Sequence, residues 1–325
     1  MEILFNLVGS NLGNNGGSHT IVRSSNILID LGYKVKLIVD GRNQYTWTDV
    51  KSEIIVSRDP NEIPDSDVII ATSFWSVDST NRCNIKNKFW WIRGWENWTN
   101  KESSLVSILK NSPSKKIVNS IGLQNKLKSF NIDSTIVYPG YDFNEIYPLN
   151  IRNLDNDIIL GGLYNNGKKR SSKRTDWIFK CYQKLKKKYP IKLFMFGIEG
   201  SPGNLVDYYI KNPNIEEKNK MYNSINIWLS SSENEGLHLT PAEAMMTECC
   251  VVGNSSLLSG TIDYLINQKT GLVSENNFDS FINCVEVLIN DKNLREELGR
   301  NGREKITSIG SREENMKKMI EVLSG

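Results

Sequence analysis

The chain has 325 residues, of which 39% are hydrophobic, and its formal net charge at pH 7 is +3. A single hydrophobic core rarely grows to this length, so the sequence predicts two globular domains. Because 40 basic side chains nearly balance 37 acidic ones, the net charge does not indicate a polyanionic partner. Local basic patches are still possible.

The cysteines and the first residues indicate a cytoplasmic protein. The five cysteines are scattered and lack a C-x-x-C pair or a nearby histidine, so they suggest neither a disulfide framework nor a zinc site. The opening MEILFNLVG has no basic n-region and is too short for a signal peptide or a membrane span. We interpret it as a buried β-strand.

Short apolar runs alternate with helical patterns in both halves of the chain. Strands are expected at 3–8, 34–39, 53–57, 67–72 and 116–120, then at 157–164, 191–197, 225–231, 249–253 and 270–273. Helices are expected at 18–31, 175–188 and 239–247. Continuous apolar strands separated by helices are typical of parallel sheets covered on both faces.

The predicted fold class is therefore α/β, with two Rossmann-like doubly wound domains facing a cleft. A proline-containing segment, 138–157, joins the two sheets. We expect a first domain at 1–148 and a second domain at 149–305. A C-terminal helix over 306–325 is expected to return to the first domain.

Ligands of open parallel sheets bind at the carboxyl ends of strands, so the loops there carry the candidate sites. In the loop GSNLGNNGGSHT, the N–H groups of Gly16 and Gly17 would approach a phosphate or a sugar at the start of a helix. A dinucleotide fingerprint with Asp40 on the ribose is an alternative, although the glycine spacing is not G-x-G-x-x-G. A plain loop without a ligand is the third interpretation.

The stretch NNGKKRSSKRTDW is dense in lysine and arginine and follows the first strand of the second half. At that position Lys168, Arg170 and Lys173 would face the cleft and could hold a diphosphate. A solvated basic loop is the alternative.

The stretch SSENEGLHLTPAEAMM places Glu235 before a helix and Glu243 within it, too far apart for an i,i+4 pair. Pro241 fits the first helical turn. We expect the backbone N–H groups of Leu237 and His238 to point into the cleft beside Glu235. Glu243 could then hold a ribose and Glu235 a sugar hydroxyl, or both could only favour the helix dipole.

The stretch FWWIRGWENW holds four tryptophans together with an arginine and a glutamate. In a loop at a strand end, this density favours an acceptor wall formed by Trp91, Arg93, Trp95 and Glu96, because aromatic faces stack on sugar rings or bases. Core packing would account for one or two of the tryptophans.

Two other patterns are weak. The D-x-D pattern at Asp65 and Asp67 precedes a predicted strand, so turn chemistry is favoured over a metal site. The chain has only two histidines, His19 and His238, and offers no Ser/His/Asp triad.

Together these motifs resemble the retaining glycosyltransferases of family four, which have the GT-B fold. SSENEGLHLTPAEAMMTECCVVG is similar to the family pattern PSxxEGFGxxxxEAMAxGxPVV, and GTIDYLINQKTGLV to GGxxEVIxxGxxGxLV. GGSHTIVRSSNILIDLGYKV resembles the N-terminal Gly-Gly loop and helix, and TIVYPGYDFNEIYP resembles the interdomain VIPNGVDxxxFxP. The resemblance covers nearly the whole chain, and the glutamate pair is its most specific part.

The resemblance implies roles for individual residues. Glu243 would bind the nucleotide ribose, and Glu235 would lie at the donor sugar with Gly236, Leu237 and His238. Lys173 in KRTD matches the diphosphate-binding lysine of the family's KGxD.

Some positions depart from the family pattern. The arginine of the family's GRL is Gly162 here, so its charge would come from Lys168 or Arg170. Asp263 replaces the glutamate of GxxE, and the catalytic-loop histidine has no counterpart near 90–98, where Arg93 or Glu96 would substitute.

The resemblance implies transfer of a sugar from a UDP-, GDP- or dTDP-sugar to a hydroxyl acceptor, with retention at the anomeric carbon and without a metal or other cofactor. Glu235, His238 and Lys173 form the expected catalytic set, and Lys173 with the Gly16 and Gly17 N–H groups would stabilise the leaving diphosphate. The expected acceptor is a glycan or glycoconjugate.

Alternatives remain open at this stage. The acceptor could be a modified nucleic-acid base, although nothing indicates nucleic acid, and peripheral membrane contact also stays open. An NAD-dependent oxidoreductase that uses Asp40 is the alternative from another class.

Overall fold

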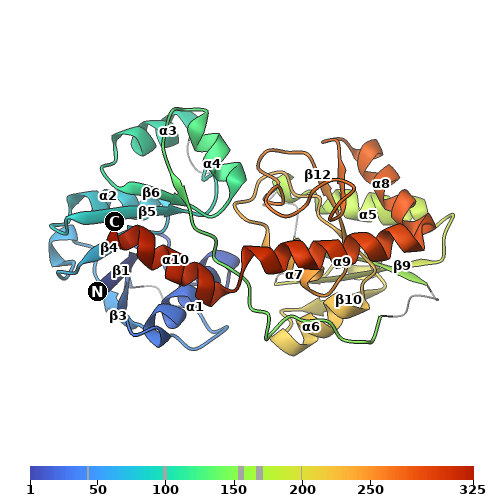
Figure 1. Ribbon diagram of the computed structural model, residues 1–325, viewed down its shortest axis with the longest axis horizontal. Coiled ribbons are helices and arrows are strands. Elements are labelled where there is room, and N and C mark those ends of the chain that lie inside the picture. Colours follow the sequence, from blue (N-terminus) through green and yellow to red (C-terminus); the bar gives the residue numbers. More distant parts are fainter. Residues whose placement is uncertain (42–43, 98–100, 153–156, 166–170, 199) are drawn as a thin grey trace. The chain divides into compact units, whose positions relative to one another are not determined.

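The computed structural model describes residues 1–325 apart from 42–43, 98–100, 153–156, 166–170 and 199 (Figure 1). The chain divides into two compact units, each with its own parallel sheet. Unit 1 comprises Met1–Gly140 with Ser311–Gly325, and unit 2 comprises Tyr141–Gly310. The predicted divisions lie after residues 148 and 305, whereas the structure divides the chain after Gly140 and Gly310.

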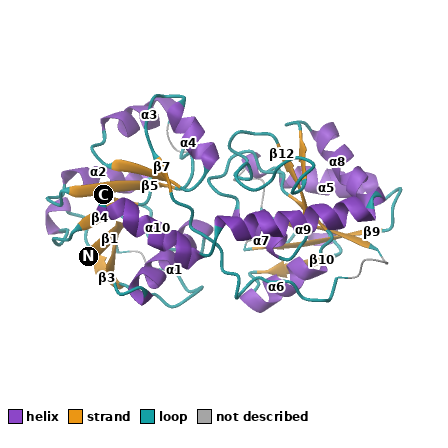
Figure 2. Cartoon of the chain, viewed as in Figure 1, coloured by secondary structure: helices purple, strands orange, loops and turns teal. Residues whose placement is uncertain are grey.

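Unit 1 contains a seven-stranded sheet with the order β3-β2-β1-β4-β5-β6-β7, flanked by helices (Figure 2). Its strands are β1 (Glu2–Asn6), β2 (Lys34–Val39), β3 (Glu53–Val56), β4 (Val68–Ala71), β5 (Asn87–Ile92), β6 (Lys115–Val118) and β7 (Thr135–Ile136). Its helices are α1 (Gly16–Asp30), α2 (Val77–Arg82), α3 (Glu102–Asn111), α4 (Ile121–Lys128) and α10 (Arg312–Ser324). The strand order reverses between β1 and β4, which pair in parallel, and ligands of such sheets bind beside the carboxyl ends of these strands.

The inner strands of unit 1, such as β1 and β4, are buried on both faces, as continuous apolar runs in a parallel sheet require. On one face, Phe5 and Trp91 belong to a core that includes Met316 and Met319 of α10. On the other face, Leu4 packs in a separate cluster with residues that precede and follow α2.

The return of the chain to unit 1 depends on a close backbone approach. A Cβ atom on Gly140, whose φ is +71°, would lie 2.4 Å from the carbonyl oxygen of Ser311. Arg312 also donates from Nη1 to the carbonyl of Pro139 at 3.2 Å. The helix that packs on unit 1 is therefore α10 alone, and the predicted helix 306–325 begins inside the preceding helix of unit 2.

Unit 2 contains a six-stranded parallel sheet with the order β10-β9-β8-β11-β12-β13. Its strands are β8 (Ile158–Leu163), β9 (Ile191–Gly197), β10 (Tyr208–Lys211), β11 (Ile227–Leu229), β12 (Cys250–Asn254) and β13 (Leu272–Ser274). Its helices are α5 (Thr175–Leu185), α6 (Ile215–Ser224), α7 (Leu239–Met246), α8 (Phe278–Asn290) and α9 (Lys292–Ile309). Within the described residues, no helix has the length and apolar character needed to cross a membrane.

Three strands, β5, β7 and β10, were not predicted from the sequence. The tryptophan-rich stretch is not simply a loop, because Asn87–Ile92 forms the inner strand β5 between β4 and β6. Its bulky apolar residues belong to the core of a sheet that is covered on both faces. The aromatic pattern alone does not distinguish such a core strand from a ligand-binding wall. The short edge strands β7 and β10 have no clear apolar run and were not predicted.

Candidate active site

The loop between β11 and α7 carries Glu235, and α7 carries Glu243. Helix α7 has His238 at its N-cap with an extended conformation, and Pro241 lies in the first turn, where N–H groups have no intrahelical acceptor. The buried amide of Asn254 donates to the Ser232 carbonyl at 2.8 Å and so fixes the start of the loop.

Three predicted catalytic residues come together in unit 2. Lys173 Nζ lies 2.5 Å from Glu235 Oε1, and His238 Nε2 lies 3.5 Å from the same oxygen. The hydroxyl of Ser231 donates to the carbonyl of Lys173 at 3.0 Å, which ties the lysine to the glutamate loop. These side chains line a small cavity of about 10 Å³, with Thr240 at its edge.

The electrostatics of this cluster favour an ionised glutamate and a neutral histidine. Burial alone would raise the pKa of Glu235, but the charge that His238 carries when it is protonated at low pH, together with Lys173, outweighs burial, so the pKa is lowered. Burial lowers the pKa of His238, and Lys173 adds to this effect against the opposing charge of Glu235. The ring of His238 lies 3.1 Å from Ser230 Oγ and 3.2 Å from Thr240 Oγ1.

The following loop holds the backbone of this site. His238 N–H donates to the Gly260 carbonyl at 2.9 Å, and Tyr264 Oη donates to the His238 carbonyl at 2.5 Å. The prediction that the His238 N–H points at a ligand is therefore wrong, because Gly260 already accepts it. Gly260 has a φ of +73°, and a Cβ atom there would lie 2.6 Å from Glu235 Cβ, so only glycine fits. Gly236 and Leu237, which lie between Glu235 and His238, are buried.

Glu243 has a separate set of partners on helix α6. Lys218 Nζ donates to Oε1 at 2.9 Å, and Tyr222 Oη donates to Oε2 at 2.7 Å. Both oxygens of an ionised carboxylate keep further lone pairs, so Glu243 can still accept hydroxyl groups. Sequence reasoning missed Lys218 and Tyr222 because they precede the motif and contact it only through the fold.

The start of α5 is built around Arg174. Its φ of +48° is left-handed, at the position where the family pattern KGxD has glycine. Its guanidinium pairs with Glu233, bonds Asn276 and lies 4.4 Å above the ring of Trp177. These contacts hold the strained residue that directly follows Lys173.

The remaining residues that were predicted to bind the donor, or to replace the family's arginine, lie in different surroundings. Lys168 and Arg170 lie outside the described residues. Gly162 faces the core, where a Cβ atom would lie 2.8 Å from Ile178 Cδ1, so the family's arginine would not fit in this strand. In unit 1, a Cβ atom on Gly16 would meet no atom within 4 Å, whereas one on Gly17 would lie 3.5 Å from Arg93 Nη1.

The predicted aromatic acceptor wall is wrong for its two tryptophans. Trp91 is 0% exposed and Trp95 is 1% exposed, so neither indole can stack on a ligand. Trp91 packs in the core with Phe5, and Trp95 stacks on Phe130 at a centroid distance of 5.9 Å. Both tryptophans stabilise unit 1.

Arg93 and Glu96 lie near the carboxyl end of β5 and contact neighbouring loops. Arg93 donates to the carbonyls of Gly17 at 2.6 Å and Thr72 at 2.9 Å, and burial lowers its pKa to about 10. Glu96 Oε2 accepts the Phe74 N–H at 2.9 Å, and burial raises the pKa of this carboxyl. A buried carboxyl with a raised pKa is a frequent feature of functional sites.

Among the described residues of this region, Trp75 has an exposed indole, and sequence reasoning missed it. It follows β4, is 51% exposed and packs edge-to-face with Phe74 at a centroid distance of 5.4 Å. The carboxylate of Glu96 accepts the N–H of Phe74, the residue before Trp75. Phe74 therefore links the Glu96 carboxylate to the Trp75 indole.

The D-x-D pattern lies in an irregular segment that ends in a bend at Asp67. Asp67 Oδ2 accepts the Glu2 N–H at 2.7 Å, and Asp65 Oδ1 accepts the Ser66 N–H at 3.0 Å. Both residues precede β4, at the amino ends of the strands.

We expect His238→Gln to remove part of the pH dependence of stability. The lowered pKa means that the unfolded chain binds a proton at this position more readily than the folded chain. The free energy of unfolding of the original chain should therefore fall more than that of His238→Gln between about pH 7.5 and about pH 5.5. Urea titrations measure this difference, and His19→Gln is the control; equal pH dependence in the original chain and His238→Gln would contradict it.

Trp91→Ala should destabilise the protein strongly, and Trp75→Ala should not. Loss of a buried tryptophan typically costs about 3–5 kcal/mol, whereas an exposed side chain usually changes stability by about 0.5 kcal/mol or less. Urea unfolding of both variants tests the corrected assignment. A Trp91→Ala chain of unchanged stability but weakened acceptor binding would restore the original prediction.

The comparisons with known proteins agree with this geometry. Residues 167–305, which include the Lys173, Glu235 and Glu243 positions, match the family model "Glycosyl transferases group 1". The capsular polysaccharide biosynthesis glycosyltransferase CapM of Staphylococcus aureus is 28% identical over 131 residues, which are 37% of this chain and 34% of CapM. The chain thus matches about a third of the length of this relative.

Solved structures extend the similarity to both units. Sucrose-phosphate synthase from Thermosynechococcus elongatus has a TM-score of 0.79 at 14% identity, over 99% of this chain and 98% of that one. HepE from Anabaena, solved in complex with UDP-glucose, has a TM-score of 0.77 at 11% identity, over 100% and 99% of the two chains. The chain has the GT-B fold, and the residues that match the group 1 glycosyltransferase model lie within unit 2.

Proposed function

We propose that the chain transfers a sugar from a nucleotide diphosphate sugar to a hydroxyl acceptor, with retention at the anomeric carbon and without a metal ion. One observation supports this proposal most strongly. Glu235 Oε1 lies 2.5 Å from Lys173 Nζ and 3.5 Å from His238 Nε2, and all three residues lie within the segment that matches the glycosyltransferase model. Glu243 lies in the same domain with both carboxylate oxygens oriented by α6.

The donor would be bound by two carboxylates and a cation. Glu243 would accept the ribose hydroxyls, which suits a fixed, ionised carboxylate. Lys173 would stabilise the charge that develops on the leaving diphosphate, together with the N–H groups at Gly16 and Gly17 and the basic residues Lys168 and Arg170.

Glu235 and His238 would lie at the donor sugar. The bond between the anomeric carbon and the diphosphate oxygen breaks, a bond to the acceptor oxygen forms on the same face, and the diphosphate takes the acceptor's proton. Lys173 would hold Glu235 ionised during this step, and the neutral His238 ring would accept or donate a hydrogen bond without adding charge.

The acceptor in this proposal is a glycan or glycoconjugate. Arg93 and Glu96 supply polar groups for its hydroxyls, and the exposed indole of Trp75 supplies an aromatic face for a sugar ring. CapM is named for capsular polysaccharide biosynthesis, which supports an acceptor of this class. We also expect a cytoplasmic location, because all five cysteines are free thiols.

A panel of nucleotide sugars tests the proposal. UDP-glucose is the first choice because the HepE structure contains it, followed by GDP- and dTDP-sugars, each assayed for released nucleoside diphosphate with candidate glycans and with EDTA. Release with one donor that continues in EDTA is expected. No release with any donor would contradict the proposed transfer, and activity lost in EDTA and restored by manganese would contradict metal independence.

A further inference from the structure

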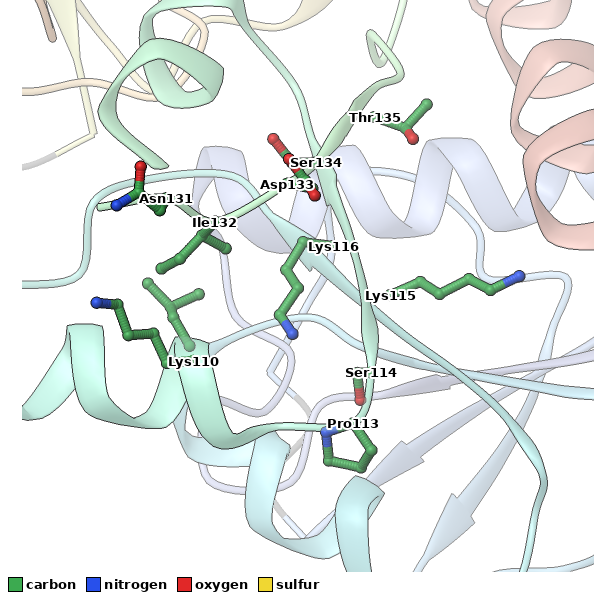
Figure 3. A pocket seen from close by; sticks show the side chains of 11 residues that line it. Lys110, Pro113, Ser114, Lys115, Lys116, Asn131, Ile132, Asp133, Ser134 and Thr135 are labelled. Carbon is green, nitrogen blue, oxygen red and sulfur yellow. The ribbon is translucent and has the colours of Figure 1, made fainter. Parts of the chain in front are cut away.

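Polar side chains converge on the imidazole ring of His238 in unit 2. Ser230 Oγ lies 3.1 Å from Nδ1 of the ring, whereas Thr240 Oγ1 and Glu235 Oε1 lie 3.2 Å and 3.5 Å from Nε2. The lysine side chains that line a cavity of about 540 Å³ in unit 1 point in different directions instead (Figure 3). The two ring nitrogens of His238 therefore have distinct sets of neighbours.

The ring of His238 is a departure from the family pattern. EGLH of this chain matches EGFG of the pattern, which has glycine at the position of His238. Because glycine has no side chain, the pattern gives no role to this imidazole or to a residue that contacts it. Ser230 directly follows β11, His238 directly precedes α7, and the loop between them brings the two side chains together.

The charges around the ring determine which nitrogen carries its proton. The pKa of Glu235 is lowered, so its carboxylate is ionised and can only accept hydrogen bonds. Burial lowers the pKa of His238 with a further contribution from Lys173, against the charges of Glu235 and Glu243. The neutral ring has one N–H and one lone pair, and an N–H on Nε2 faces the carboxylate favourably, whereas a lone pair there would be repelled.

The neighbours of the ring fit this tautomer. When the proton is on Nε2, Nδ1 is an acceptor, and the hydroxyl of Ser230 can donate to it. The hydroxyl of Thr240 can accept from Nε2–H. Ser230 is 2% exposed, so its hydroxyl is held inside the protein beside the ring. A hydrogen bond at one imidazole nitrogen sets the proton on the other.

We propose that Ser230 is a positioning residue whose hydroxyl donates to Nδ1 of His238 and holds the ring with its proton on Nε2, directed at Glu235. In the proposed sugar transfer, on which the effect on turnover rests, Nε2–H and Lys173 would together orient the Glu235 carboxylate at the donor sugar. Without the Ser230 hydroxyl, the proton could move to Nδ1 or the ring could turn away from Glu235.

Nitrogen-15 NMR of the full chain with labelled histidine tests the tautomer without turnover. The chain has two histidines, so the signals that remain in His19→Gln identify those of His238 in the original chain. At about pH 8, where a histidine of ordinary or lowered pKa is neutral, Nε2 should resonate as a protonated nitrogen and Nδ1 as a hydrogen-bonded acceptor.

Ser230→Ala should move the Nδ1 resonance towards that of a nitrogen without a hydrogen bond. Ser274→Ala is the matched control and should leave the resonance in place, because Ser274 is also buried and its hydroxyl donates to the Gly253 carbonyl at 3.0 Å. A protein that is only destabilised would not change this signal. A proton on Nδ1 in the original chain, or an Nδ1 resonance unchanged in Ser230→Ala, would overturn the proposal.

Turnover then measures the consequence of this positioning. Ser230→Ala should lower kcat about 2- to 10-fold, as expected for loss of one hydrogen bond, and should leave the KM for the donor unchanged. An unchanged kcat in Ser230→Ala would overturn the positioning role. The predicted tautomer in a chain that releases no nucleoside diphosphate would support the Ser230 hydrogen bond and contradict the proposed transfer, so the two failures are distinguishable.

Discussion

Lys173→Met is expected to lower kcat for sugar transfer about 10²- to 10³-fold, the usual cost of removing one group that stabilises charge in a transition state. Lys173 is the described cation nearest to Glu235, at 2.5 Å, and the Ser231 hydroxyl fixes its backbone. Initial rates of nucleoside diphosphate release, measured at saturating donor, give kcat directly.

Two variants make this result interpretable. Lys187→Met removes an exposed lysine just after α5 and should leave kcat unchanged. Glu235→Gln keeps the shape of the side chain and should also lower kcat, because it removes the charge that Lys173 faces. If Lys173→Met folds, binds donor and keeps its full kcat, the proposed role of Lys173 is wrong.

Glu243→Ala is expected to raise the KM and Kd for the nucleotide sugar about 10- to 100-fold, with a smaller effect on kcat. Hydrogen bonds to a charged group typically contribute about 1.5–3 kcal/mol, and each 1.4 kcal/mol corresponds to about tenfold in affinity. Calorimetry with the nucleoside diphosphate measures the effect without turnover.

The partners of Glu243 provide a graded control. Tyr222→Phe removes only the hydroxyl that orients Oε2 and should raise Kd less than Glu243→Ala does. Glu243→Gln keeps a similar shape but loses the charge, so its effect should lie between the two. Unchanged donor affinity in Glu243→Ala would contradict the ribose assignment.

The sequence predicted the frame of the fold well because its strands are short, continuous apolar runs. The strand at 34–39 and the strand at 191–197 are observed with the predicted bounds. Helix α7 was predicted to within one residue at each end, since Pro241 and the small residues after it define the helix start. Its motif also located Glu235 and Glu243 correctly on opposite sides of that start.

The contacts of the site could not be predicted from local patterns. Lys218 and Tyr222 lie on α6, and nothing in their spacing points to Glu243. Gly260 contacts His238 only because the fold brings two loops together.

The prediction of an acceptor wall from the tryptophan-rich stretch was wrong for a different reason. Dense aromatic residues suit a binding wall and a sheet core equally, and only the burial of Trp91 and Trp95 decides between them. Among the described residues of these loops of unit 1, the exposed indole is Trp75, which lies outside the tryptophan-rich stretch and gives no such signal.

The most direct test of the account is proton NMR of the complete reaction, which follows the anomeric proton of the donor sugar into the product. The account predicts that the sugar moves to a hydroxyl of the acceptor with the anomeric configuration of the donor, and that Glu243→Ala slows this at low donor concentration. A product of inverted configuration, or a chain that binds the nucleotide sugar and forms no glycoside with any acceptor, would contradict it.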